Sequence, residues 1–127
     1  AAQSQQASNS RGGKGTPGTK LQSFRLGQCL VYVGRNSRQN DHVSFSMANP
    51  TDLWFHARGV PGSHCLLRFD AGTDVDEEEL QFAADLAAYF SKARGSGEVP
   101  VQWTQAKHLK RVPGGGPGMV QVSWPLK

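Results

Sequence analysis

The stretch DLWFHARGVPGSHCLLRF, residues 52–69, contains two short apolar segments separated by a turn sequence. Leu53–Arg58 is rich in aromatic and apolar side chains that prefer extended backbone, so it predicts a β-strand. Val60–Ser63 contains a proline followed by a glycine, which is typical of β-turns, and His64–Phe69 is apolar again. The sequence therefore predicts that the two apolar segments pair as an antiparallel hairpin.

Upstream of this hairpin, Phe24–Val33 predicts a strand, or a short hairpin that turns at Gly27. The next segment, GRNSRQND at residues 34–41, is dominated by polar side chains and predicts a loop. His42–Ala48 fits two structures, because its apolar residues alternate as in a strand while good helix N-cap residues precede it. We favour a short helix there.

Downstream of the hairpin, Asp74–Arg94 predicts one long helix. Asp74 followed by Glu77 fits a capping box, and Gly95 is a typical residue just beyond a helix end. An apolar stripe recurs at helical spacing and comprises Phe82, Leu86, Tyr89, Phe90 and Ala93. The helix can therefore pack one face against a sheet.

Two more strands are predicted at Val99–Thr104 and Met119–Trp124, joined by a basic stretch and a loop of glycine and proline. Strands, one long helix and further strands indicate an α+β fold. We expect a small, mainly antiparallel sheet packed by one long amphipathic helix. The 127 residues allow a single domain.

The beginning of the chain differs in composition from the rest. Residues 1–20 are rich in Gln, Ser and Gly and contain no aliphatic residue larger than Ala, so they cannot bury enough surface to fold. We predict a disordered tail or linker at residues 1–23, followed by the domain at residues 24–127. The acid-free tail also has the style of an organellar transit peptide, so the predicted location is cytoplasmic, or the chloroplast stroma in that case.

The net charge of +4 is unevenly distributed along the chain. Residues 59–90 contain seven acidic residues and one Arg, whereas the segments before and after them are net positive. Basic faces beside one acidic face are typical of nucleic-acid binders, although an ordinary solvated surface has a similar composition. No apolar run exceeds five residues, which excludes a membrane-spanning segment.

Histidines and cysteines give little evidence for a metal site or for catalysis. His56, His64 and Cys65 supply three of the four ligands that a structural zinc site needs, so we expect no metal. The sequence lacks a nucleotide-binding glycine loop and a nucleophile elbow, so we expect neither a cofactor nor enzymatic activity. Both cysteines lie in apolar segments, where buried thiols are expected rather than a disulfide.

Polar, basic and aromatic side chains together give the strongest functional signal. Arginine and amide side chains bind phosphates and base edges, and exposed aromatic rings stack on unpaired bases. Trp54 and His56 share one face of their predicted strand, where they could stack on bases or pack in a core. The other candidates are Arg35, Asn36, Arg38, Gln39 and Asn40 on the polar loop, and Lys92 and Arg94 at the helix end.

Two longer stretches resemble a known domain. They are VYVGRNSRQNDHVSFSMANPTDLWFHARGVPGSHCLLR, residues 31–68, and AADLAAYFSKARGSGEVPVQWTQAKHLKRVPGGGPGMVQV, residues 83–122. The compound pattern G-R-N…Q-N-D…D-L-W-F-H…P-G-S-H resembles the NFACT-R domain of ribosome-quality-control factors, called RqcH in bacteria and NEMF in animals. The departures are Cys65, where aliphatic residues are common, and an extra glycine within residues 114–116.

This resemblance implies an RNA-binding domain. Full-length relatives recognise a split large ribosomal subunit with an obstructed peptidyl-tRNA, recruit tRNA and drive template-free tailing of the stalled chain. The domain is therefore expected to help bind tRNA or rRNA on stalled large ribosomal subunits, and we expect a monomer with no membrane partner. The family motif adds Ser63 and His64 to the nucleic-acid-binding set, and adds Asp41, Asp52 and Ser91 as orienting residues.

In this interpretation, Arg35, Lys92 and Arg94 contact phosphates, while Trp54 and His56 stack on bases or pack under the site. Asp52 is expected to orient His56 or an arginine, because a carboxylate repels phosphate. Three alternatives stay open: a protein–protein docking module that uses the acidic residues 76–79, a DNA-binding module without catalysis, and an enzyme that acts on RNA.

Overall fold

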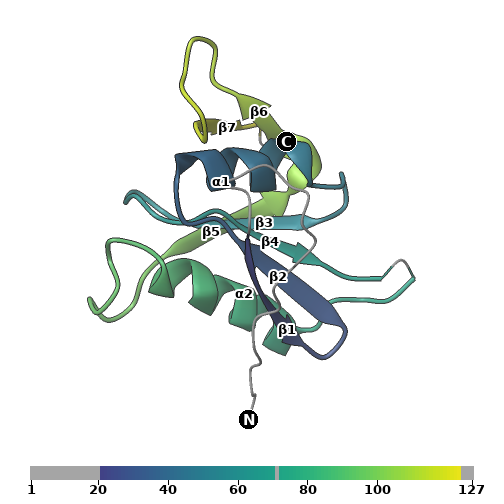
Figure 1. Ribbon diagram of the computed structural model, residues 1–127. Coiled ribbons are helices and arrows are strands. Elements are labelled where there is room, and N and C mark those ends of the chain that lie inside the picture. The colour runs from purple at the N-terminus through teal and green to yellow at the C-terminus, as the bar shows by residue number, and fades with distance from the viewer. Residues whose placement is uncertain (1–20, 71, 124–127) are drawn as a thin grey trace.

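The computed structural model describes residues 21–70 and 72–123 (Figure 1). Its main element is a five-stranded sheet in the order β1-β2-β4-β3-β5, in which all neighbouring strands are antiparallel. This confirms the α+β fold with an antiparallel sheet. The strands are β1 (Gln22–Leu26), β2 (Cys29–Val33), β3 (Leu53–Ala57), β4 (Cys65–Arg68) and β5 (Val101–Gln105).

Both predicted hairpins are present. β1 and β2 form the first, and Gly27 in their turn has a φ of +62°, a backbone conformation that favours glycine. β3 and β4 form the second, in which Phe55 pairs with Cys65. The predicted disordered tail, at residues 1–23, lies outside the described residues up to residue 20, and β1 begins at Gln22 rather than at Phe24.

The long helix α2 (Glu77–Tyr89) is shorter than predicted at both ends. Its capping box is formed by Asp76 and Glu79: the Glu79 backbone N–H donates to Asp76 Oδ1 at 2.9 Å, and the Asp76 N–H donates to Glu79 Oε1 at 3.0 Å. The predicted Asp74–Glu77 box was therefore wrong by two residues. At the other end, Phe90 takes the C-cap position, so Gly95 does not end the helix.

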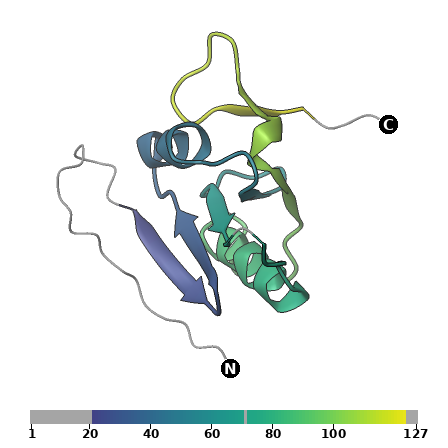
Figure 2. The same ribbon diagram turned by 90° about the vertical axis from the view of Figure 1, so that its right-hand side faces the viewer.

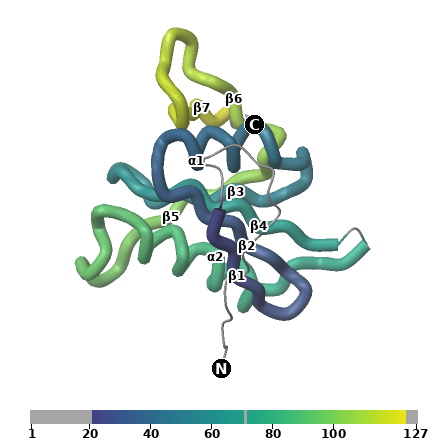
Figure 3. The backbone as a smooth tube through the Cα atoms, viewed as in Figure 1, coloured from purple at the N-terminus to yellow at the C-terminus, as the bar shows by residue number. Residues whose placement is uncertain are grey.

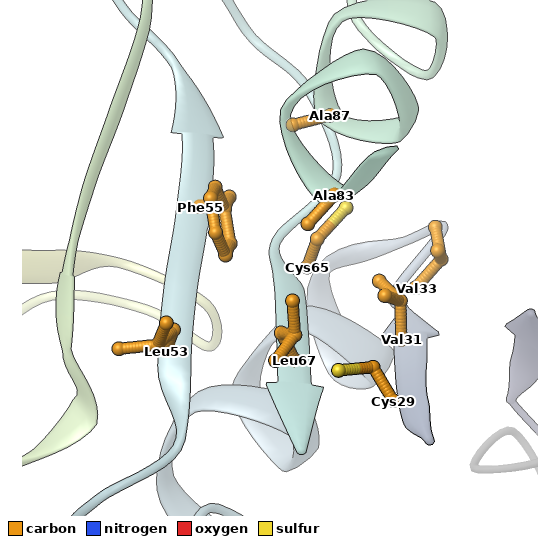
Figure 4. Packing of buried hydrophobic residues seen from close by; sticks show 9 residues of the cluster. All are labelled: Cys29, Val31, Val33, Leu53, Phe55, Cys65, Leu67, Ala83 and Ala87. Atoms are coloured by element: carbon orange, nitrogen blue, oxygen red, sulfur yellow. The ribbon is translucent and has the colours of Figure 1, made fainter. Parts of the chain in front are cut away.

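One face of the sheet packs against α2. Phe55, Leu67 and Val31 are buried there, and Ala83 and Ala87 of α2 have no exposed surface, so the helix backbone lies close to the strands. Figure 4 shows these side chains converging between sheet and helix. Cys29 and Cys65 belong to the same cluster as buried free thiols, as expected, and burial raises the pKa of Cys29 to about 12.

The other face of the sheet is also covered, which the sequence did not predict. A short helix α1 (Ser37–Asp41) continues directly into a wider, π-type turn, η1 (His42–Ser46), so the predicted polar loop at residues 34–41 is half helical. The helical prediction for His42–Ala48 is confirmed. Figure 2 shows α1 and α2 on opposite sides of the sheet.

A second, two-stranded sheet completes this layer. It pairs β6 (Leu109–Arg111) with β7 (Val120–Val122), following a short 3₁₀ turn, η2 (Ala106–His108). β7 falls within the predicted strand Met119–Trp124, whereas β6 lies in the basic stretch where no strand was expected. Figure 3 shows the hairpin at the end of the molecule away from α2. In the part of the chain that the structure describes, no helix has the length and apolarity that crossing a bilayer requires.

Candidate nucleic-acid interface

An open groove of about 450 Å³ lies where three segments meet. They are the start of α1, the turn between β3 and β4, and the chain that leaves α2. We call it the basic groove, and seven of the predicted site residues line it: Arg35, Asn36, Asn40, Ser63, Ser91, Lys92 and Arg94. The structure thus brings together residues that are up to about sixty positions apart in the sequence.

Two walls of the basic groove are bonded to each other through the backbone. The Lys92 N–H donates to the Pro61 carbonyl at 2.9 Å, and the Ser63 N–H donates to the Phe90 carbonyl at 3.0 Å. Gly62 lies so close to Ser91 that a Cβ atom at this glycine would be 2.9 Å from the serine Cβ. A side chain at position 62 would therefore push the walls apart.

The third wall is held by amide side chains of the polar segment. Asn36 is the N-cap of α1, and its side chain accepts a 2.8 Å hydrogen bond from the Gln39 N–H. Gln39 Oε1 accepts from the Arg35 N–H at 2.8 Å, and Asn40 Oδ1 accepts from the His64 N–H at 3.0 Å. These predicted ligand-binding amides therefore also position the helix and join it to β4.

Three cationic side chains stand exposed around the basic groove. The Arg35 guanidinium lies 4.5 Å from the centre of the Phe90 ring and donates to Gln22 Oε1 at 2.8 Å. Lys92 and Arg94 are exposed on the wall formed by the chain that leaves α2. Among the described residues, none of the three cations forms an ion pair with a carboxylate, so their positive charge is available to an anion.

Tyr89 is a groove residue that the sequence did not single out. It is 50% exposed, and the Arg94 guanidinium lies 4.0 Å from its ring centre and donates to its hydroxyl at 2.9 Å. The sequence placed Tyr89 in the apolar stripe of the helix, because its spacing fits that stripe. The available signal was its polar hydroxyl beside the Ser-Lys-Ala-Arg segment at the helix end.

Behind the groove lie the predicted residues Trp54, His56 and His64 together with Ser44, which the sequence analysis did not single out. We call these four residues the buried aromatic cluster. Trp54 is only 2% exposed, so of its two predicted roles, stacking on bases or packing under the site, its burial fits the second. Its Nε1–H donates to Ser44 Oγ at 3.0 Å, and Ser44 Oγ lies 2.7 Å from His64 Nδ1.

His64 shares this serine with Trp54. A hydroxyl can donate one hydrogen bond and accept two, so Ser44 Oγ can bond both rings whichever His64 nitrogen carries the proton. Burial, together with the neighbouring His56, lowers the pKa of His64 to about 3. The ring is therefore neutral at physiological pH and adds no positive charge to the groove.

His56 is less buried than its neighbours in the cluster. Its ring stacks on Trp54 with a centroid distance of 5.8 Å and meets His64 edge-on at 5.2 Å. Burial lowers the pKa of His56, and a hydrogen bond with the backbone of Gly62 partly opposes this effect. His56 therefore connects the cluster with the floor of the basic groove.

The two predicted orienting aspartates form ion pairs with arginines. Asp52 is nearly buried and accepts from Arg68 Nη2 at 2.7 Å, while the same Arg68 atom donates to the Met47 carbonyl at 2.7 Å. Asp41 Oδ1 accepts from Arg111 Nη1 at 2.6 Å, which lowers the pKa of Asp41 and joins α1 to β6. The partner of Asp52 is thus an arginine and not His56.

Two further predictions concern residues around the cluster. Arg38 and Gln39 do not line the basic groove, although Arg38 is exposed on the adjacent helix. Cys65 packs on the α2 side of the sheet, whereas His64 packs with Trp54 on the other side, so they cannot share a metal ion. Within residues 21–70 and 72–123, no group of three metal-ligating side chains comes together.

A family model, described as the NFACT protein RNA binding domain, matches residues 22–122. The chain belongs to this family. The match covers the five-stranded sheet, both helices and the β6–β7 hairpin, and so includes every residue of the basic groove. The chain is thus an NFACT RNA-binding domain, as the resemblance implied.

Bacterial proteins named "Rqc2 homolog RqcH" contain similar sequences. The protein from Streptococcus suis is 46% identical over 94 residues, which are 74% of this chain and 17% of that protein. The protein from Bacillus subtilis is 41% identical over 90 residues, 71% of this chain and 15% of that protein. This NFACT-R chain therefore spans about one sixth of the length of these relatives.

A solved structure has the same fold. It is the C-terminal part of the fibronectin/fibrinogen-binding protein from Streptococcus suis, with a TM-score of 0.70 and 45% sequence identity. The alignment covers 76% of this NFACT-R chain and 38% of that chain.

Proposed function

We propose that this NFACT-R domain binds tRNA or large-subunit rRNA on stalled large ribosomal subunits, and that the basic groove is its RNA contact surface. Support for the ribosomal setting comes from relatives at 41–46% identity that are named RqcH. The domain would act as a monomer within a cytoplasmic ribosome complex. The relatives named above are bacterial, and they give no support to a chloroplast location.

The observation that carries the proposal is a group of three exposed cations, Arg35, Lys92 and Arg94, that have no carboxylate partner within residues 21–70 and 72–123. Phosphate oxygens are the common ligands of such side chains in RNA complexes. Arg35 and Arg94 each lie over an aromatic ring, which restrains the guanidinium. Each uses one nitrogen to bond Gln22 or Tyr89 and keeps further N–H donors for a phosphate. Two phosphates held by these two arginines would fix the direction of the RNA backbone through the groove.

Tyr89 would supply the stacking surface that Trp54 cannot. Half of its surface is exposed at the rim of the groove, beside Arg94, one of the three residues proposed to hold phosphate. Stacking on an exposed aromatic ring tolerates any base, so this contact would not restrict the domain to one RNA sequence. Asn36, Asn40, Ser63 and Ser91 add polar atoms to the walls of the groove.

The test is a titration of the chain with tRNA, a large-subunit rRNA fragment and duplex DNA of matched length, each at two salt concentrations. We expect stronger binding to RNA. The double variant Arg35→Ala/Arg94→Ala should lower the affinity and reduce the slope of log K against log salt by about one to two, because two phosphate contacts are lost.

A second double variant, Arg25→Ala/Arg58→Ala, is the matched control, because it removes two exposed arginines that do not line the groove. It should retain the salt dependence of the unaltered chain. Equal losses in the two double variants would indicate diffuse electrostatic attraction and contradict the groove. An unchanged slope in a folded Arg35→Ala/Arg94→Ala chain would do so as well.

A further inference from the structure

A second and larger groove, of about 1180 Å³, runs between α2 and β5. We call it the acidic groove, because Glu77, Glu78, Asp85 and Glu98 line it together with apolar residues, and no basic residue of the described part of the chain lines it. Its charge is therefore opposite to that of the basic groove. An RNA backbone would be repelled there, so this groove needs a different explanation.

The strand beside the acidic groove has a free edge. β5 is the last strand of the sheet and pairs only with β3 among the described residues. The Ala106 N–H donates to the Asp52 carbonyl at 2.8 Å, and the Arg58 N–H donates to the Pro100 carbonyl at 2.9 Å. Hydrogen-bonded pairs alternate in an antiparallel ladder, so the even-numbered residues of β5 face β3. The N–H and C=O groups of Val101, Trp103 and Gln105 consequently face outward.

Trp103 stands at the junction of the free edge and the acidic groove. It is 47% exposed although it is a large apolar side chain. One face of its ring stacks on Phe55, with the centroids 5.8 Å apart and the planes 15° from parallel. The opposite face of the indole is left to a binding partner, and an indole ring is the preferred aromatic surface for a Lys or Arg side chain.

We propose that β5 and the acidic groove bind an extended, lysine- or arginine-rich segment of a partner protein. The segment adds as a strand to the outer edge of β5, which provides backbone hydrogen bonds at every second residue. Its basic side chains on one face reach the four carboxylates and the ring of Trp103. This function goes beyond RNA binding and uses a different surface, so a single domain joins a basic protein segment to RNA.

The test measures fluorescence anisotropy of a labelled peptide of about nine residues that alternates lysine with valine, a length sufficient to span β5. The 127-residue chain is titrated against it, and a peptide with glutamate in place of lysine is the control. Trp103→Ala should weaken binding of the lysine peptide by about tenfold, through loss of the cation–aromatic contact.

A sharper variant is Gln105→Pro. The φ of Gln105 is −73°, close to the value that proline requires, and its N–H points away from β3. The substitution therefore removes one outward donor while it leaves the ladder with β3 intact, as proline does on edge strands. We expect about fivefold weaker peptide binding. Affinity for tRNA, measured on the same variant, should stay unchanged.

Three results would overturn the proposal. One is equal binding of the lysine and glutamate peptides, and another is no binding of the lysine peptide at about 1 mM protein. The third is unchanged peptide affinity in both Trp103→Ala and Gln105→Pro. The tRNA titration is a separate measurement. A negative peptide result would therefore not contradict RNA binding at the basic groove, and a negative tRNA result would not contradict peptide binding at β5.

Discussion

The basic groove and the buried aromatic cluster lie next to each other but are built on opposite principles. In the groove, Arg35, Lys92 and Arg94 keep their charges in water and have no carboxylate partner among the described residues. In the cluster, Trp54 and His64 are almost fully buried and hydrogen-bond to a shared serine. The first region can meet a ligand, while the second can only support the surface that does.

Residue type alone therefore does not distinguish a side chain that contacts a ligand from one that is buried beneath the binding surface. Tryptophan and histidine are good stacking groups for bases, and tyrosine at a helix end resembles a core residue. In the structure Trp54 is only 2% exposed and cannot reach a base, whereas Tyr89 is 50% exposed and can. Substitutions in the two regions should therefore change different measured quantities.

The largest effect is expected from Trp54→Ala. Removal of a fully buried large aromatic side chain leaves a cavity, and the hydrogen bond to Ser44 is lost with it. We expect the free energy of unfolding in urea to fall by about 3–5 kcal/mol. If the variant kept its stability and lost only RNA affinity, Trp54 would belong to the binding surface and the comparison would fail.

Acid should destabilise the cluster by the next largest amount. His64 has a pKa of about 3 in the folded chain, below the ordinary value of 6.5 that it regains on unfolding. Between these two pH values the unfolded chain binds a proton that the folded chain does not, so stability falls as the pH falls. The free energy of unfolding falls by about 1.4 kcal/mol for each pH unit below 6.5.

Urea unfolding at pH 6.5 and at pH 4.5 measures this loss, and His64→Gln is the control. Asp41 contributes little in that interval, because its carboxyl pKa is lowered from an already low value. The lowered pKa of His56 destabilises the folded chain in acid in the same way as that of His64. His64→Gln should therefore reduce, but not abolish, the fall in unfolding free energy between pH 6.5 and pH 4.5. An identical slope in the variant would show that His64 is not held neutral.

The smallest effect is expected from Tyr89→Leu, and it should appear in binding. Loss of the exposed ring should weaken RNA binding by about 1 kcal/mol, the lower end of the range for stacking on one base. Tyr89→Phe, which keeps the ring and loses only the hydroxyl that accepts from Arg94, should bind nearly as well as the original chain. Equal affinity of all three proteins would remove Tyr89 from the interface.

Local sequence patterns predicted the parts of the fold that depend on neighbours in the chain. The β3–β4 hairpin followed from apolar segments around a Pro-Gly turn. Seven predicted residues line the basic groove, and all of them except Ser91 were proposed as nucleic-acid contacts, Ser63 through the family motif. The start of α2 was ambiguous, because both Asp74 and Asp76 are followed three residues later by a glutamate. The structure uses Asp76, which begins the helix so that Ala83 and Ala87 face the sheet.

The errors occurred where distant segments meet. α2 ends early because the chain after Tyr89 bonds to the β3–β4 turn, through Phe90 and Lys92. β6 was missed because Leu109–Arg111 is short and basic and becomes a strand only beside β7. Trp54 was assigned two possible roles because the sequence did not show that η1 and the β6–β7 hairpin pack on its face of the sheet.

The close contact between Gly62 and Ser91 has a consequence for the kinetics of binding. Because backbone hydrogen bonds already join the two walls, the groove has little conformational freedom to lose when a ligand arrives. Association should then approach the rate set by diffusion and charge. Differences between RNA ligands should appear mainly in how long each one stays bound.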